Sequence, residues 1–174
     1  MRTRGKLLVC LLPACLLLWS LTSLVMARTP QQEDIAVVVN PSNPVNSLTL
    51  ADLRKTYMGE RQYWKSNSPV VLLMRARGSW ERDVILRLLF QMSEEQYTQY
   101  WVAKAMRAEI SDPPASLFSS GMVQEGIRGN PGAIGYVNAS EVRPGVKVLR
   151  IGGLLPGEAG YPLRDARAST IAER

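Results

Sequence analysis

Histidine is absent from the sequence, and the only two cysteines, Cys10 and Cys15, lie within an apolar segment at the N-terminus. Outside that segment a site therefore has no imidazole base, no thiol nucleophile and no zinc ligand set of the usual Cys and His type. Ser79 follows a predicted strand, as a hydrolase nucleophile would, but it stands in neither a G-x-S-x-G nor an S-x-x-K pattern. We therefore expect no enzyme, no metal site and no cofactor.

The sequence also has little excess charge. It contains 21 Lys and Arg against 15 Asp and Glu, and without the first 27 residues 18 basic residues would face 15 acidic ones. Basic residues interleaved with aromatics, the pattern typical of a nucleic-acid surface, do not form a run. We expect no nucleic-acid partner.

The first 27 residues have the pattern of an export signal. A basic start precedes an apolar stretch that ends in Val25-Met26-Ala27, a small-residue pattern that favours cleavage after Ala27. The stretch is also long enough to span a bilayer, so an uncleaved N-terminal membrane anchor is an alternative, and lipidation at Cys15 is a weaker one. The expected location is periplasmic or secreted.

The rest of the chain has the pattern of one α/β domain. We expect a signal peptide at 1–27, a flexible leader at 28–34, a single domain at 35–164 and a disordered tail at 165–174. Within the domain, β-branched runs and helix caps predict strands at 35–39, 69–74, 133–137, 146–151 and 161–163, and helices at 50–57, from Ser79, at 94–107 and at 120–129. This order predicts a small sheet with helices on both faces.

The turn between the second strand and its helix is the candidate site. Arg75 and Arg77 precede Gly78 and the N-cap residue Ser79, and Trp80 begins the helix. A helix N-terminus favours anions, and guanidinium groups match the geometry of oxyanions. These five residues are the predicted anion-binding set. The alternative interpretation is that Ser79 only caps the helix and both arginines are solvated.

Several other side chains carry expectations. The rings of Tyr63 and Trp64 are expected to pack against the domain. An inner helix face is expected to hold four residues, Tyr97, Tyr100, Trp101 and Met106, and four acids, Glu81, Asp83, Glu94 and Glu95, are expected to be helix-start and surface charges.

Three segments in order carry a family resemblance: Ala36–Pro41 (AVVVNP), Leu48–Leu53 (LTLADL) and Asn130–Val137 (NPGAIGYV), with a Tyr57-Met58-Gly59 helix stop between the second and third. Together they resemble the phosphate-binding proteins of bacterial phosphate uptake transporters, which are type II periplasmic binding proteins. The likeness covers about 35–151. Because the full proteins have two lobes, the resemblance implies one lobe, a small mixed sheet with helices on both faces.

In the family that this chain resembles, residues of an R-x-D-G-S-G-T signature bind phosphate. Arg75, Gly78 and Ser79 match it, whereas Arg77, Trp80 and Glu81 stand where the family has Asp, Gly and Thr. The resemblance thus implies an oxyanion site that has lost the hydrogen-bond acceptor of the family's Asp. It also implies a changed charge at Arg77 and at Glu81.

The function expected from residues and resemblance together is an exported, non-enzymatic solute-binding module. Its ligand would be phosphate or another small oxyanion, in connection with an ABC-type uptake system and its membrane transporter. The alternative is a periplasmic protein-interaction module that has lost ligand binding, with Trp80 on its rim docking another protein or a second copy in a homodimer.

Overall fold

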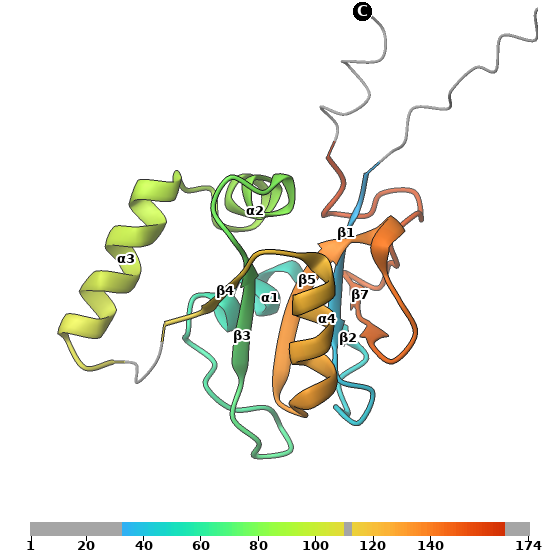
Figure 1. Cartoon of the computed structure of the whole chain (residues 1–174), viewed down its shortest axis with the longest axis horizontal. Coiled ribbons are helices and arrows are strands. Elements are labelled where there is room, and N and C mark those ends of the chain that lie inside the picture. The colour runs from blue at the N-terminus through green and yellow to red at the C-terminus, as the bar shows by residue number, and fades with distance from the viewer. Residues whose placement is uncertain (1–32, 110–112, 166–174) are drawn as a thin grey trace, which may run out of the picture.

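The centre of the molecule is a five-stranded mixed sheet (Figure 1). The computed structural model describes residues 33–109 and 113–165. The strand order is β4-β3-β5-β1-β6, with bounds β1 (Ile35–Val39), β3 (Val71–Arg75), β4 (Ala115–Leu117), β5 (Ala133–Asn138) and β6 (Lys147–Val148). β3 runs parallel to β4 and β5, whereas β1 runs antiparallel to β5 and β6. The predicted α/β class with a small mixed sheet is confirmed.

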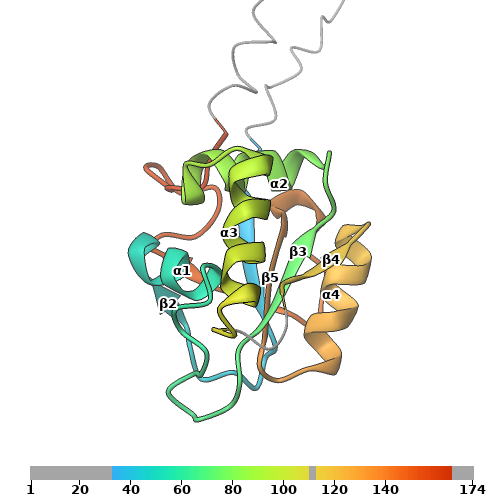
Figure 2. The same ribbon diagram turned by 90° about the vertical axis from the view of Figure 1, so that its left-hand side faces the viewer.

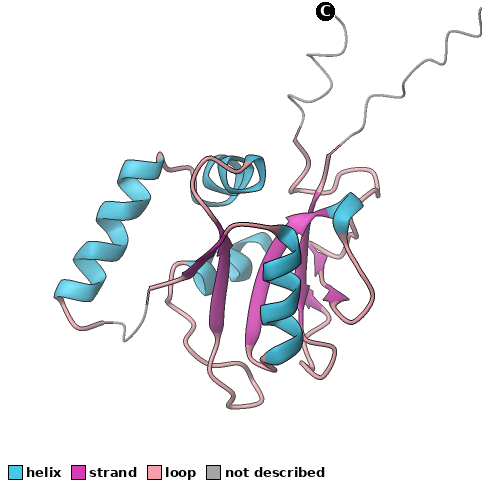
Figure 3. Ribbon diagram, viewed as in Figure 1, coloured by secondary structure: helices cyan, strands magenta, loops and turns pink. Residues whose placement is uncertain are grey.

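Helices cover both faces of this sheet (Figure 3). Every side chain of β1 is buried, and alternate residues point to opposite faces. Ala36 and Val38 pack with α4 (Ser120–Gly129). The other three residues of β1 pack in the larger cluster, which includes side chains of α1 (Leu50–Tyr57), α2 (Trp80–Ile85) and α3 (Glu94–Met106). In the view of Figure 2, α3 stands in front of the sheet, between α1 and β3.

Side-chain caps begin these helices where the sequence predicts them. Thr49 Oγ1 accepts from the backbone N–H of the third residue of α1 at 3.0 Å. Ser93 and Gln96 form a reciprocal capping box at the start of α3. Ser119 caps α4. The helix after Ser79 is α-helical only over α2 and continues as a π-helical turn, η1 (Leu86–Phe90).

The predicted strand at 146–151 is wrong in one respect, because it is two short strands in two sheets. β6 pairs with β1, while β7 (Arg150–Ile151) pairs in parallel with β2 (Ser47–Leu48) in a separate two-stranded sheet. Leu149, between them, donates its N–H to Val37 O, and Arg150 donates to Asn46 O. The chain thus passes from one sheet to the other within a single residue.

Both ends of the domain extend beyond the predicted boundaries. Asp34, assigned to the flexible leader, is buried and accepts from Arg164 Nε at 2.8 Å. Asp165, assigned to the disordered tail, is buried and pairs with Arg87 at 2.9 Å. The expected strand at 161–163 is a turn, whose Leu163 carbonyl accepts from the N–H of Ile35. The predicted signal peptide, residues 28–32 of the leader and residues 166–174 of the tail lie outside the described residues. Within 33–109 and 113–165, no helix combines the length and apolarity needed to cross a membrane.

Some side-chain expectations are also corrected. Met106 is 84% exposed and Tyr63 is 59% exposed, so neither packs into the domain as expected. Trp64 does, with its Nε1 donating to Gly132 O at 2.8 Å. Glu81 is buried rather than a surface charge.

Candidate functional site

The carboxyl ends of three parallel strands meet at one edge of the sheet. Arg75 is the last residue of β3 and lies opposite Leu117, the last residue of β4. Ser119 follows β4 by two residues, and Ser140 follows β5 by two residues. In α/β sheets this edge is where ligands bind, because loops and helix N-termini converge there. The topology therefore gathers three polar segments that are far apart in sequence.

A polar hollow of about 640 Å³ opens at this edge. It is lined by Arg75, Ser119, Ser120, Gly121, Ser140, Glu141, Val142 and Arg143. Two guanidinium groups, three hydroxyls and the N-terminus of the ten-residue helix α4 thus face a single space.

Unpaired donors point to the kind of ligand that fits here. The backbone N–H groups of Ser120 and Gly121, in the first turn of α4, have no partner within the described part of the chain. Ser119 Oγ accepts from Met122 N at 3.1 Å, which leaves its own hydrogen free to donate. These donors stand at the positive end of the helix dipole, so the hollow is suited to an anion.

Arg143 adds a positive charge at the same place. Its backbone N–H donates to the buried side chain of Gln124 at 2.7 Å, which anchors the residue. Its Nη1 lies 3.8 Å from the position that a β-carbon on Gly121 would occupy. Among residues 33–109 and 113–165, its guanidinium has no hydrogen-bond or ion-pair partner.

Arg75 is held more firmly. Its Nε donates to Glu81 Oε1 at 3.0 Å, its Nη1 donates to Leu117 O at 3.2 Å, and its side chain is only 11% exposed. Glu81 Oε1 also accepts from Ser120 Oγ at 3.1 Å. The carboxylate of Glu81 thus occupies part of the hydrogen-bonding surface of Arg75. The Nη2 of Arg75 has no partner among the described residues.

The other four predicted residues do not line the hollow. Arg77 pairs with Glu94 at 2.9 Å and donates to Thr98. Ser79 Oγ donates to Ala76 O at 2.8 Å and caps α2. Gly78 adopts a φ of +77°, a conformation that favours glycine. Trp80 Nε1 donates to Asp165 Oδ2 at 3.2 Å. Only Arg75 of the predicted set lies at the hollow.

Arg82, which the sequence reasoning missed, holds the end of β3 in place. It is 6% exposed, and its Nε and Nη2 donate to the two carboxylate oxygens of Glu94 at 2.6 and 2.8 Å. Its Nη1 donates to Arg75 O at 3.0 Å, and its guanidinium lies 5.4 Å from the centre of the Tyr97 ring. This network fixes the backbone that presents Arg75 to the hollow.

Arg143, Ser119 and Ser140 were also missed as site residues. Ser119 stands out in the sequence only as a helix cap, and the other two lie in a polar loop. Ser140 and Arg143 follow the predicted strand at 133–137, and this position points to a site once the sheet order is known, because such positions gather at the carboxyl edge of a parallel sheet. Ser119 follows β4, a strand that was not predicted.

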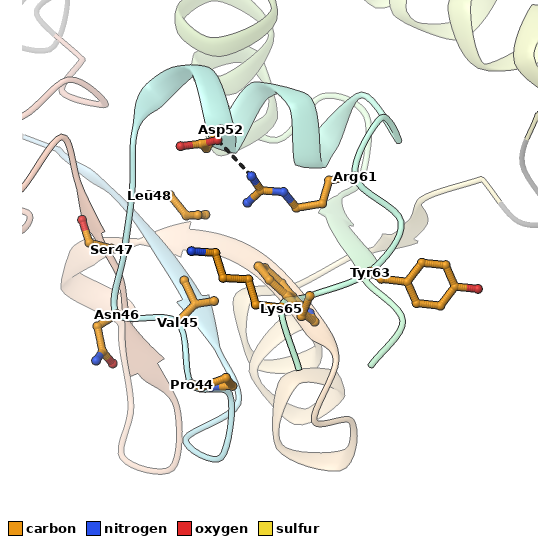
Figure 4. A pocket seen from close by; sticks show the side chains of 10 residues that line it. Pro44, Val45, Asn46, Ser47, Leu48, Asp52, Arg61, Tyr63 and Lys65 are labelled. Atoms are coloured by element: carbon orange, nitrogen blue, oxygen red, sulfur yellow. Dashed lines mark hydrogen bonds and ion pairs between the residues drawn. The ribbon is translucent and has the colours of Figure 1, made fainter. Parts of the chain in front are cut away.

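A second hollow, of about 440 Å³, lies between the segment 44–48 and the loop 61–65 (Figure 4). Its Arg61 pairs with Asp52 at 2.9 Å, and Tyr63 points away from it. This second hollow contains no residue from the carboxyl ends of β3, β4 and β5, and its Arg61 already has Asp52 as an acidic partner. Across the described part of the chain, no group of three or more His, Cys, Asp or Glu side chains could hold a metal ion.

Comparisons with known proteins identify a matching family and similar solved structures. Residues 31–160 match the model of the PBP superfamily domain. A putative phosphate ABC transporter substrate-binding protein with bound phosphate from Clostridium perfringens is 25% identical, with a TM-score of 0.58 over 70% of this chain and 46% of that one. An ABC-type phosphate transport receptor from Vibrio cholerae is 22% identical, with a TM-score of 0.63 over 78% and 55%. PstS from Borrelia burgdorferi is 17% identical, with a TM-score of 0.61 over 81% and 61%. The chain spans about half the length of these structures.

Proposed function

Because this chain belongs to the PBP superfamily, we propose that it is a non-enzymatic solute-binding module that takes a small oxyanion, with phosphate as the first candidate, into the hollow at the carboxyl edge of its sheet. The proposed contacts are the two arginines Arg75 and Arg143, the Ser119 hydroxyl and the free N–H groups of Ser120 and Gly121.

The observation that carries this proposal is Arg143 at the N-terminus of α4. Within the described residues, an arginine without an ion-paired acid stands beside N–H groups that have no partner, and this concentrates positive potential that an anion would neutralise. Hydrogen bonds to a charged group contribute about 1.5–3 kcal/mol each. Two such contacts would give a dissociation constant on the order of millimolar or tighter.

Two carboxylates and the open site limit the affinity. Glu81 competes for Arg75, and Glu141 lines the hollow with an exposed side chain. In the described part of the chain the hollow opens to solvent, so water can reach a ligand there. We therefore expect weaker binding than a closed two-lobed site would give.

The proposed biological setting is phosphate uptake. The similar structures from Clostridium perfringens and Vibrio cholerae are named for phosphate ABC transport, and the former holds bound phosphate. For this chain we propose export by the N-terminal segment, with cleavage after Ala27, a periplasmic or secreted location, and a membrane transporter as the partner.

The protein-interaction alternative has less support. It was argued from Trp80 as an exposed anchor, but this side chain is partly buried, packs against the larger core cluster and donates to Asp165. An interface anchor must be free to enter a partner's pocket.

A thermal-shift screen tests the proposal. Phosphate, sulfate and chloride would be added to the purified protein at constant ionic strength. A ligand at ten times its dissociation constant stabilises the folded state by about 1.4 kcal/mol, which raises the melting temperature by a few degrees. We expect phosphate to raise it more than chloride does. Equal effects of all three anions up to tens of millimolar would contradict the proposed function.

A further inference from the structure

An apolar hollow adjoins the polar one. Its volume is about 530 Å³, and it shares Ser119, Gly121 and Arg143 with the polar hollow. Its remaining walls are formed by Leu73, Leu117, Met122, Glu125 and Gly126. The two hollows are therefore continuous around the guanidinium of Arg143.

The apolar character of this second hollow follows from its walls. Met122 is 46% exposed, in the first turn of α4, and Leu117 is partly exposed at the end of β4. Gly126 lies so close to Leu73 that a β-carbon there would stand 2.8 Å from Leu73 Cδ1, so no side chain from this helix position fills the space. Apolar surface left in contact with water is surface that a ligand can cover favourably.

We propose that the physiological oxyanion carries a short apolar group, as an alkyl phosphate or an alkylphosphonate does. This inference rests on the proposed function, since the charged end would occupy the polar hollow under Arg75 and Arg143. The apolar group would extend past Arg143 along Met122 and Leu117. A bare inorganic anion would leave this apolar surface uncovered.

One carboxylate, that of Glu125, also lines the apolar hollow. Glu125 lines the apolar hollow with a side chain that is 73% exposed, and it pairs with Arg128. The Arg128 hydrogen bond, followed by its charge, lowers the pKa of the Glu125 carboxyl, so this side chain is negative at neutral pH. The charge of Arg143 contributes to the same lowering, so Glu125 partly offsets the attraction of Arg143 for an anion.

Calorimetric titration of the purified protein with inorganic, methyl, butyl and hexyl phosphate tests the inference. At pH 8 the three alkyl phosphates are largely dianions, because the second pKa of a phosphomonoester is about 6. A fully buried methylene group strengthens binding about fourfold, and a half-covered one about twofold. Hexyl phosphate should therefore bind at least about tenfold tighter than methyl phosphate.

Two methionine variants test whether the gain in affinity from methyl to hexyl phosphate arises in the apolar hollow. Met122→Ser should reduce the gain from methyl to hexyl phosphate to about threefold or less and leave methyl phosphate binding unchanged. Met106→Ser is the matched control, because Met106 is an exposed methionine on α3 that does not line the hollow. It should keep the full gain.

The outcomes separate this inference from the proposed function. Binding of all four compounds with equal affinity would overturn the inference and leave oxyanion binding intact. Binding of none of them would overturn both. An equal loss in Met106→Ser and Met122→Ser, or hexanol binding as tightly as hexyl phosphate, would overturn the placement of the apolar group beside the anion.

Discussion

Two groups of arginines lie on either side of the end of β3, and they differ in how far their charges are already matched. Arg77 and Arg82 share one carboxylate, Glu94, which accepts from both. Arg75 donates to Glu81 through one guanidinium nitrogen, and the guanidinium of Arg143 has no hydrogen-bond or ion-pair partner within 33–109 and 113–165, although its charge lowers the pKa of Glu125. The guanidinium groups of Arg77 and Arg82 are both paired with a carboxylate of the protein. Those of Arg75 and Arg143 keep N–H donors that have no partner among the described residues.

The difference shows that the number of arginines in a turn does not make an anion site. A guanidinium that already donates to a carboxylate must lose that partner before it can bind a ligand, and replacing one charged hydrogen bond with another yields little net free energy. The proposed site therefore depends on the donors left without a partner among the described residues, and these lie beside α4 rather than at the start of α2.

The largest expected effect comes from alkaline pH acting on buried tyrosines. Burial raises the pKa of four tyrosines, Tyr57, Tyr97, Tyr136 and Tyr161, above the ordinary value of 10.0. Above pH 10 the unfolded chain therefore loses protons that the folded state keeps, so stability is fully present below pH 10 and falls as pH rises. Urea unfolding should show a loss of up to about 4 kcal/mol between pH 10 and pH 11. A flat profile would contradict the burial of these hydroxyls.

Removing Arg82, one of the two arginines paired with Glu94, should have an effect of similar size. Arg82→Ala removes one partner of a buried ion pair and should lower the free energy of unfolding by about 3–5 kcal/mol. The matched control is Arg77→Ala, because this side chain is 63% exposed and pairs with the same Glu94. It should cost less than about 1 kcal/mol. Urea denaturation measures both, and equal losses would mean that the two arginines are not distinguished by burial.

Removing the negative charge that pairs with Arg75 should strengthen anion binding. In Glu81→Gln the amide oxygen can still accept from Arg75 and Ser120, but the competing negative charge is gone. We expect about tenfold tighter phosphate binding, equivalent to about 1.4 kcal/mol, measured by calorimetric titration. Unchanged affinity would mean that Glu81 does not limit the site.

A smaller effect is expected at the helix that supplies Glu94. Ser93→Ala removes the cap of α3 and should cost about 1 kcal/mol in the free energy of unfolding. Ser66→Ala, at an exposed serine outside the helices, should be nearly neutral. A loss at Ser66 as large as that at Ser93 would contradict the capping role.

Features encoded by neighbouring residues could be predicted from the sequence. The helix at 50–57 and the start of the helix at residue 94 were predicted correctly, because a cap and its target lie three residues apart. The five-residue run of β1 was also predicted correctly, since a continuous β-branched run is typical of a strand buried on both faces.

Features that depend on distant partners could not be predicted in this way. The split between β6 and β7 depends on pairing with β1 and β2, about 100 residues earlier in the chain. Glu81 is buried because Ser120, 39 residues away, donates to it. The polar hollow needs the ends of three strands, so Arg143 becomes a candidate only once the sheet order is known.

The most direct test of the account is phosphate binding by two single variants, Arg143→Ala and Arg77→Ala, compared with the unchanged protein by calorimetric titration. Arg143 is exposed and unpaired within the described residues, so its loss should leave the fold intact, and circular dichroism with urea unfolding checks this for both variants. We expect Arg143→Ala to weaken phosphate binding at least tenfold and Arg77→Ala to leave it within about twofold. The reverse result, with binding lost in Arg77→Ala and kept in Arg143→Ala, would place the site at the start of α2 and contradict the account.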